Sequence, residues 1–194
     1  MSDLLQIAKQ VFPYLTDEQL ITARSIGELV PLNEGEIFIK EGERSKKVGL
    51  VVHGIMRNYI LNDNGEQVTV VFATEMQTIT THATILLNRP ASETCEAVEP
   101  TMLFVFDYGD FNKLKDTDPV FSRVHAQVLE LMLIAPHASI TAITPPQPIE
   151  RYQRLLDKHG YLIERAPLKY LASYLGITPV SLSRIRKRLS KGTN

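Results

Sequence analysis

The spacing of apolar residues changes near residue 118, and this change restricts the possible folds more than any other feature. From about residue 30 to 107 the sequence contains short runs rich in Val, Ile and Phe, among them VGLVVHGIMRNYIL at 48–61 and QVTVVFA at 67–73. Such runs, separated by turn residues, predict β-strands. Beyond residue 118 apolar residues recur every three or four positions, which predicts helices. We therefore expect an α+β chain with an N-terminal antiparallel β-roll.

Turn residues inside the strand region indicate a small, compact sheet structure. Glycines recur at intervals of about ten residues, as in small barrels and sandwiches: Gly35, Gly42, Gly54 and Gly65. Asn64 and Gly65 readily adopt the positive φ angles of a tight turn, so NDNGE at 62–66 predicts a hairpin. Ahead of the strands, LTDE at 15–18 supplies a cap and a first turn for a helix.

The segment 118–143 predicts one long helix that pairs with a second copy of the chain. Asp118 is the expected N-cap and Pro119 the expected first helical residue. The apolar residues that follow have the spacing of a coiled-coil seam: Phe121, Val124, Val128, Leu131, Ala135, Ala138 and Ala142. Further apolar residues flank this seam and favour a helix with two partners, although packing on its own subunit alone stays open. Pro136 removes a backbone hydrogen bond at a cost of about 3 kcal/mol, so we expect a kink there or two helices end to end.

The charge of the chain changes sign after a proline-rich joint, TPPQP at 144–148. Residues 1–150 carry 11 Lys and Arg against 20 Asp and Glu, whereas residues 151–194 carry 10 Lys and Arg against 2 Asp and Glu. A basic segment on an otherwise acidic protein is typical of a nucleic-acid-binding module. We therefore divide the chain into a first domain at 1–117, a long helix with a hinge at 118–145, and a basic domain at 146–194.

The basic domain has the layout of a helix-turn-helix. IERYQRLLDKHG predicts a helix that ends at Gly160 and has one inward face: Tyr152, Leu155, Leu156 and His159. PLKYLASYL and TPVSLSRIRKRLSK then predict two helices joined at Gly176, with these residues directed inward: Leu168, Leu171, Ala172, Leu175, Leu182, Ile185 and Leu189. Thr178 is the expected N-cap of the last helix, and Pro179 is its expected first residue.

Over nearly its whole length the chain resembles the Crp/Fnr family of bacterial transcription regulators. The resemblance is strongest in LVVHGIMRNYILNDNGE and LKYLASYLGITPVSLSRIRKRL, and the second stretch is especially similar to members from Bacteroidetes-type bacteria. It implies a cyclic-nucleotide-binding-like sensor, a dimerisation helix and a C-terminal winged-helix, helix-turn-helix domain whose following strands are missing or minimal. The implied partners are double-stranded DNA, a second copy of the chain and RNA polymerase, without a membrane.

The resemblance also implies which residues contact DNA. The stretch from Thr178 to Arg184 is similar to the turn of the recognition helix that reads base edges, and Arg184 matches an arginine directed at guanine or a nearby phosphate. Pro179 and Val180 stand where many members have Glu or Arg, so the usual recognition sequence is not expected. The candidate DNA-binding residues are Lys169, Thr178, Pro179, Val180, Ser181, Ser183, Arg184, Arg186, Lys187, Arg188 and Lys191. For the basic residues beyond Arg184, a solvated helix face stays an open alternative.

For the sensor, the resemblance implies a pocket for a small-molecule effector. Members that bind cyclic nucleotides have a Gly-Glu pair on a short helix, followed by Arg-Ser or Arg-Thr that holds the cyclic phosphate. Glu75 matches the Glu, but Ala91 and Ser92 stand where the Arg-Ser pair belongs, and Arg89 is displaced by two residues. A buried phosphate would lack its cationic partner, so we do not expect cyclic AMP to bind. The candidate pocket residues are Glu75, Met76, Thr84, Arg89, Ala91 and Ser92; no cofactor is expected, and the effector is unidentified.

Several function classes are disfavoured by composition and motifs. Cys95 is the only cysteine, which excludes a disulfide framework and a cysteine-rich metal or iron–sulfur site; we expect it as a small buried residue in a strand. The N-terminus has no secretory signal and no apolar run is long enough for a membrane span, so we expect a cytoplasmic protein. We expect no enzyme and no metal site, because motifs of common enzymes are missing and the five histidines are scattered. A cupin-like metalloenzyme and a protein-interaction module that does not bind DNA stay as alternatives.

Overall fold

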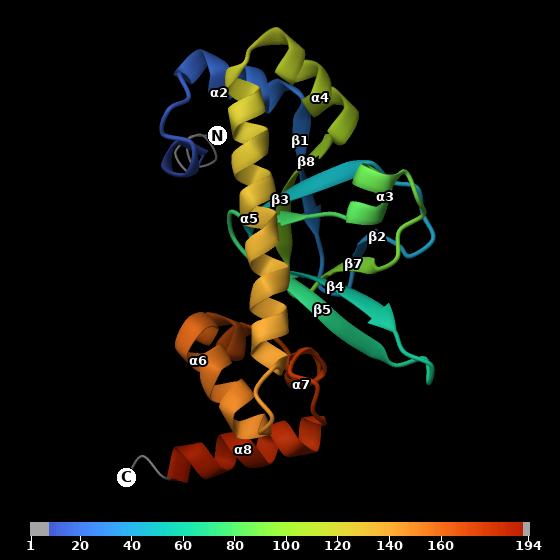
Figure 1. The fold of residues 1–194 in the computed structure, drawn as a ribbon, viewed down its shortest axis with the longest axis vertical. Coiled ribbons are helices and arrows are strands. Elements are labelled where there is room, and N and C mark those ends of the chain that lie inside the picture. The colour runs from blue at the N-terminus through green and yellow to red at the C-terminus, as the bar shows by residue number, and fades with distance from the viewer. Residues whose placement is uncertain (1–7, 192–194) are drawn as a thin grey trace.

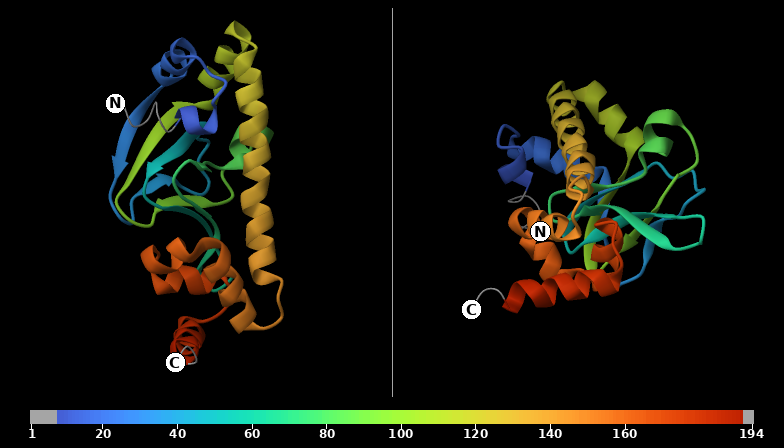
Figure 2. Two further views of the ribbon diagram at one scale, coloured as in Figure 1. Left: turned by 90° about the vertical axis from the view of Figure 1, so that its left-hand side faces the viewer. Right: turned by 60° about the horizontal axis from the view of Figure 1, so that its bottom comes forward.

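The computed structural model describes residues 8–191, without the side chains of residues 131–139, 141, 142 and 191. Figure 1 shows a β-roll beside one long helix, α5 (Val120–Ile143), with three C-terminal helices gathered at one end of that helix. Figure 2 gives the view turned by 90°, in which α5 runs along the side of the roll. The predicted order of β-roll, long helix and C-terminal helices is therefore confirmed.

The roll consists of two four-stranded sheets. The first has the order β1 (Gly27–Leu32), β8 (Thr101–Asp107), β3 (Lys47–His53) and β6 (Thr78–Ile79). The second has the order β2 (Ile37–Ile39), β7 (Thr94–Ala97), β4 (Met56–Leu61) and β5 (Gln67–Ala73). Every strand pair is antiparallel, as predicted. The inward side chains of both sheets form one apolar core, which includes Ile39, Val51, Met56, Cys95 and Leu103.

The predicted turn glycines all have positive φ angles: Gly35, Gly42, Gly54 and Gly65. In the hairpin between β4 and β5, the amide of Gly65 donates to the carbonyl of Asn62 at 2.9 Å. Only Gly65 of the predicted pair has a positive φ, at 76°, so the expectation was right for Gly65 and wrong for Asn64. The loop is longer than a two-residue turn, because the amide of Asn62 pairs with the carbonyl of Glu66.

Helix α2 (Asp17–Ser25) begins where the sequence predicts it, with Thr16 and Gln19 forming a reciprocal capping box. Two further helices, α3 (His82–Leu87) and α4 (Tyr108–Thr117), were not predicted from the residues. Asp107 caps α4 by accepting a hydrogen bond from the amide of Gly109 at 2.7 Å. Helix α4 ends immediately before Asp118. Asp118, which the sequence predicts as the cap of the long helix that follows, therefore also marks the end of α4.

Helix α5 begins one residue later than predicted, at Val120, although Asp118 still accepts a hydrogen bond from its amide at 2.9 Å. The helix continues past Pro136 to Ile143, so the alternative of two helices end to end is wrong. Phe121 and Val124 pack against α2 and α4 of the same chain. This part of the seam therefore has its partner within the subunit. The seam side chains Leu131, Ala135, Ala138 and Ala142 lie outside the described residues.

The C-terminal helices are α6 (Pro148–Arg165), α7 (Leu168–Tyr174) and α8 (Pro179–Lys191). The predicted end of this helix near Gly160 coincides with a break in α6: His159 has non-helical angles, φ −142° and ψ 44°, and a second helical segment then runs to Arg165. Tyr152 and Leu155 are buried as predicted, but Leu156 is exposed, because Leu162 and Ile163 beyond the kink complete the buried face. Residues 148–191 contain no strand, so no wing is present in this described part.

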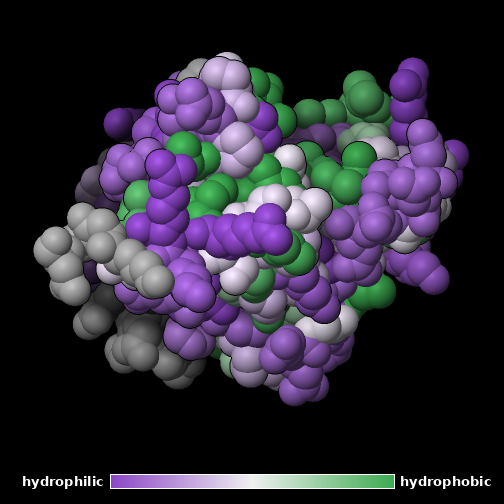
Figure 3. All heavy atoms as spheres, turned by 90° about the horizontal axis from the view of Figure 1, so that it is seen from below, coloured by the Kyte–Doolittle hydropathy of each residue, from purple (hydrophilic) through white to green (hydrophobic). Residues whose placement is uncertain are grey.

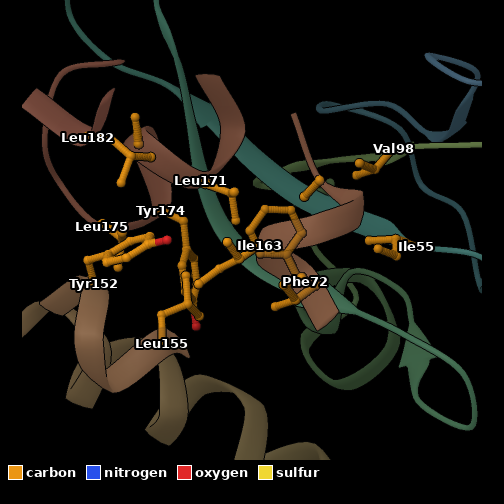
Figure 4. Packing of buried hydrophobic residues seen from close by; sticks show 13 residues of the cluster. Ile55, Phe72, Val98, Tyr152, Leu155, Ile163, Leu171, Tyr174, Leu175 and Leu182 are labelled. Carbon is orange, nitrogen blue, oxygen red and sulfur yellow. The ribbon is translucent and has the colours of Figure 1, made fainter. Parts of the chain in front are cut away.

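The C-terminal helices share one apolar core with the roll (Figure 4). Leu155, Ile163, Leu171 and other helix residues pack together with three residues of the roll: Ile55, Phe72 and Val98. The rings of Phe72 and Tyr174 meet edge to face with their centroids 5.2 Å apart. The roll and the C-terminal helices lie on opposite sides of the joint at 144–148 in the sequence, but they pack directly against each other in the structure.

Candidate DNA-binding helix and effector cavity

The turn between α7 and α8 is fixed by backbone geometry and by one arginine. Gly176 has a φ of +63°, and its amide donates to the carbonyl of Ser173 at 3.1 Å. Arg151 on α6 donates to the carbonyls of Leu175 at 3.0 Å and of Pro145 at 2.7 Å. Arg151 thereby connects the proline joint to the helix-turn-helix. The sequence did not indicate this role of Arg151, because its hydrogen-bond partners are backbone carbonyls and one of them, that of Leu175, is 24 positions away.

The start of α8 forms as the sequence predicts. The hydroxyl oxygen of Thr178 accepts a hydrogen bond from the amide of Ser181 at 3.1 Å, and Pro179 is the first helical residue. Leu182 is completely buried in the core beneath the helix, and Ile185 and Leu189 pack against the same core. One side of α8 is therefore fixed, and the opposite side is free to face a partner.

The exposed side of α8 carries most of the candidate DNA-binding residues. Val180 is 60% exposed, and the other exposed candidates on this helix are Thr178, Pro179, Ser183, Arg184, Arg186, Lys187 and Arg188. Ser181 is half-buried because it takes part in the cap. Figure 3, a view of the α8 end of the molecule, shows hydrophilic side chains over much of this face. The structure thus brings these candidates together on one helix.

Two other candidates lie apart from this group. Lys169 is on α7, with its ammonium 4.6 Å from the ring of Tyr170, a residue that contacts the roll. The side chain of Lys191, at the end of α8, lies outside the described residues. Lys169 is therefore placed beside the contact between α7 and the roll.

A bridge of charged groups connects α6 to the roll. Arg165 binds the carboxylate of Glu75 at 2.9 Å and also that of Glu99. Burial raises the pKa of Glu75. Hydrogen bonds from Arg165 and from the amide of Gly54 lower this pKa, and together they outweigh burial, so that the pKa is about 2. The two carboxylates in turn raise the pKa of Arg165 above its ordinary value. Glu75 and Arg165 are therefore both charged at neutral pH.

Polar contacts also fix α7 to the strands. The hydroxyl of Tyr170 donates to Glu96 at 3.1 Å, and its ring centroid lies 3.5 Å from the guanidinium carbon of the fully buried Arg57. Arg57 forms an ion pair with Glu96 at 3.2 Å. The hydroxyl of Ser173 accepts from the backbone amide of Thr69 at 3.2 Å. These contacts and the shared apolar core hold the helix-turn-helix in one orientation against the roll.

The structure does not bring the six effector candidates together. Glu75 lies in the turn between β5 and β6, whereas the short helix of the sensor, α3, begins only at His82. The expected position of Glu75 on that helix is wrong, because the intervening strand β6 separates the two. Ala91 and Thr84 are buried in the roll, and Arg89 and Ser92 are exposed beyond α3. Of the six, only Met76 lines the cavity described next.

A cavity of about 640 Å³ lies between β4, β5, β6, α5 and α7. Polar residues of its wall include Asn58, Thr80, His82 and Glu93, alongside apolar residues such as Val128. Sequence reasoning missed Asn58 and Glu93. A signal for Asn58 was present, because an inward-facing amide in the apolar strand IMRNYIL is expensive to bury without a function or a partner.

The remaining predicted features are also placed by the structure. Cys95 lies fully buried in β7, as expected, and burial raises the pKa of its thiol. Within residues 8–191, no group of three or more His, Cys, Asp or Glu side chains could hold a metal ion. None of the described helices is long and apolar enough to cross a membrane.

Residues 29–118, from β1 to the end of α4, match the family model of the cyclic nucleotide-binding domain. With this domain, the long helix and the C-terminal helix-turn-helix, the chain has the fold of Crp/Fnr-type regulators. The fold that the resemblance implies is thereby confirmed, while the similarity to Bacteroidetes-type members stays a prediction.

Three solved structures illustrate this similarity. FixK2 from Bradyrhizobium japonicum is 18% identical, with a TM-score of 0.70 over 87% of this chain and 86% of that chain. The c-di-GMP-responsive global regulator CLP from Xanthomonas campestris is 12% identical, with a TM-score of 0.72 over 90% and 91%. A transcriptional regulator of the CRP family from Thermus thermophilus is 14% identical, with a TM-score of 0.68 over 84% and 85%. No curated protein sequence matches the chain.

Proposed function

We propose that the chain is a sequence-specific DNA-binding transcription regulator of the Crp/Fnr type that acts as a homodimer. The observation that carries this proposal is the exposed side of α8, which combines a capped N-terminus, small polar residues and four basic residues on a helix whose other side is buried. Two of the similar structures are described as a global regulator and a transcriptional regulator, which supports the same function here. Its partners would be DNA and RNA polymerase, and its place of action the cytoplasm.

In this proposal the N-terminal turn of α8 enters the major groove. Arg184 would bind O6 and N7 of a guanine, since a guanidinium matches these two acceptors. The exposed Val180 would contact a thymine methyl group. Lys187 and Arg188 would bind phosphates, which fixes the position of the helix without reading sequence.

The dimer would form along α5, towards the end that adjoins the proline joint. Ile140 and Ile143 are 63% and 46% exposed on the isolated chain, which leaves apolar surface for a second copy. Two copies related by a two-fold axis would place their recognition helices about 34 Å apart, one turn of DNA. The contacts of Arg165 and Tyr170 with the roll fix the direction of each α8. An effector would act by favouring another orientation.

The proposal is tested by selecting binding sites from random duplex DNA with purified, ligand-free protein. A palindromic winner bound at least about 1,000-fold more tightly than scrambled DNA at physiological salt would establish a sequence-specific dimer. Only weak, salt-sensitive binding without sequence preference, even when candidate effectors are added, would contradict the proposal.

A further inference from the structure

The cavity between the roll and the helices has the size of a small-molecule site. Its volume of about 640 Å³ lies within the range of ligand pockets. Phe72 and Met76 of the roll, Ile140 and Ile143 of α5, and Tyr174 of α7 contribute to its wall. A molecule bound there would therefore contact all three parts of the subunit at once.

Two polar groups in this cavity can each accept a further hydrogen bond. Asn58 is 4% exposed, and its side-chain oxygen Oδ1 has no hydrogen-bond partner among the described residues. Its nitrogen Nδ2 donates to the carbonyl of Thr80 at 3.1 Å, and the same side chain also hydrogen-bonds to Glu93. Glu93 is partly buried, and none of the ion pairs of residues 8–191 includes it. A buried acceptor without a donor destabilises the folded protein, so the free Oδ1 of Asn58 beside the Glu93 carboxylate favours a ligand that donates hydrogen bonds.

The two acceptors lie close enough to interact. Burial raises the pKa of the Glu93 carboxyl, while the Asn58 side chain and His82 lower it. A donor bound between Asn58 and Glu93 would therefore be held by both groups.

The wall of the cavity offers little to an anion. None of the described residues that line it is Lys or Arg, and residues 131–142 of α5 contain neither type. His82 is the only residue with a basic side chain on the described wall, and it lies beside Glu93. A phosphate in this cavity would thus face a carboxylate without a permanent positive charge to balance its own.

We propose that this cavity binds a small molecule that has a protonated amine on an otherwise apolar body. An ammonium group has three donors and no acceptor, which suits the Glu93 carboxylate and the free oxygen of Asn58. The apolar body would lie against Phe72, Met76 and Tyr174. A charge-assisted hydrogen bond to Glu93 would supply most of the selectivity for a cation.

The consequence for DNA binding rests on the proposed function, whereas the binding site itself does not. Because the cavity wall includes Tyr174 and Gly176 beside the α7–α8 turn, an occupant would bias the orientation of α8. Ligand binding is therefore measured on the full chain without DNA. A failure of the DNA selection leaves that result unaffected, and a failure to bind amines leaves the DNA result unaffected.

The test uses isothermal titration with tryptamine as the cationic probe, indole-3-propionate as its anionic counterpart, and phenethylamine and octylamine as further amines. We expect at least one amine to bind at one site per subunit, and indole-3-propionate to bind at least tenfold more weakly than tryptamine or not at all. Glu93→Gln keeps the size of the side chain and removes its charge, so it should weaken amine binding at least tenfold. Glu28→Gln, at an exposed glutamate of β1 outside the cavity wall, is the control and should change nothing.

Clear outcomes would overturn the proposal. These are the absence of binding by all three amines, equal or tighter binding of the anion, or unchanged amine binding by a folded Glu93→Gln variant. If that variant does not fold, thermal denaturation of the unaltered protein decides, because tryptamine should raise its melting temperature and indole-3-propionate should not.

Discussion

At the scale of single residues, charged side chains connect parts of the chain that lie far apart in the sequence. Arg165 is 90 positions from Glu75 and 66 from Glu99, yet it contacts both carboxylates. Arg151 similarly reaches from α6 to the carbonyl of Leu175. Arg165 therefore holds α6 on the roll, and Arg151 holds α6 to the turn between α7 and α8, whereas the charged residues of α8 face outward.

Arg184→Ala should reduce affinity for the selected DNA site by about 1–3 kcal/mol, since one bidentate contact to guanine would be lost. Affinity for random DNA should change much less. Fluorescence anisotropy on both DNAs measures the difference. Arg89→Ala, at an exposed arginine of the sensor, is the matched control. Equal losses on specific and random DNA would contradict the role of Arg184 in reading bases.

Glu75→Gln should destabilise the protein most at neutral pH. The pKa of Glu75 is about 2 in the folded protein, below the ordinary 4.5, so its contribution to stability is fully present above about pH 4.5 and is lost as the pH falls through 2. We expect a loss of about 1 kcal/mol near pH 7, because the side chain is one-third exposed and solvent screens the ion pair.

Urea denaturation of the Glu75→Gln variant at several pH values measures this loss. The destabilisation should shrink as the pH is lowered through the range in which the unaltered carboxylate becomes protonated. Glu28→Gln, at an exposed glutamate of β1, should behave like the unaltered protein. A pH-independent effect of Glu75→Gln would show that its charge does not stabilise the fold.

At the scale of elements, the turn between α7 and α8 depends on the backbone, and α5 depends on its neighbours. Gly176 allows the left-handed conformation that reverses the chain into α8. In α5, the same apolar spacing serves two purposes: Phe121 and Val124 pack inside the subunit, whereas Ile140 is exposed. Periodicity alone identifies an apolar face of a helix but does not say which partner covers it.

Gly176→Ala should lower the free energy of unfolding by about 1–2 kcal/mol, because an alanine is strained at a φ of +63°. Gly160→Ala in α6 is the contrasting substitution, since its added methyl group would meet only Leu156 at an ordinary 4.0 Å. That change should be neutral or stabilising. Thermal denaturation compares the two, and equal effects would contradict the importance of the left-handed turn.

At the scale of the whole molecule, the C-terminal helices, the roll and α5 form one packed body around a shared core and a cavity. Arg165, Tyr170 and Ser173 connect the C-terminal helices to the roll through polar contacts, in addition to the shared apolar core. The cavity borders this contact. A change inside the cavity is therefore well placed to alter the orientation of α8.

Ile140→Asp should convert a dimer into monomers, because it introduces a charge into the apolar surface proposed for pairing. Sedimentation equilibrium at micromolar concentration should show a halved mass, and binding to a palindromic site should weaken. Ile21→Asp is the matched control, since Ile21 is 62% exposed on α2, outside the surface proposed for pairing. A dimer that survives Ile140→Asp unchanged would place the pairing surface elsewhere.

The sequence by itself determined the features that depend on neighbouring residues. The strands with their glycine turns, the cap at Thr178, the reversal at Gly176 and the buried place of Cys95 all follow from local propensity and spacing. Only the tertiary structure decided that a second helical segment follows the break at His159, that Glu75 binds Arg165 instead of lying on the short helix, and that Asn58 and Glu93 meet in one cavity. Each of these depends on residues that are distant in the chain, and spacing within one segment carries no information about such contacts.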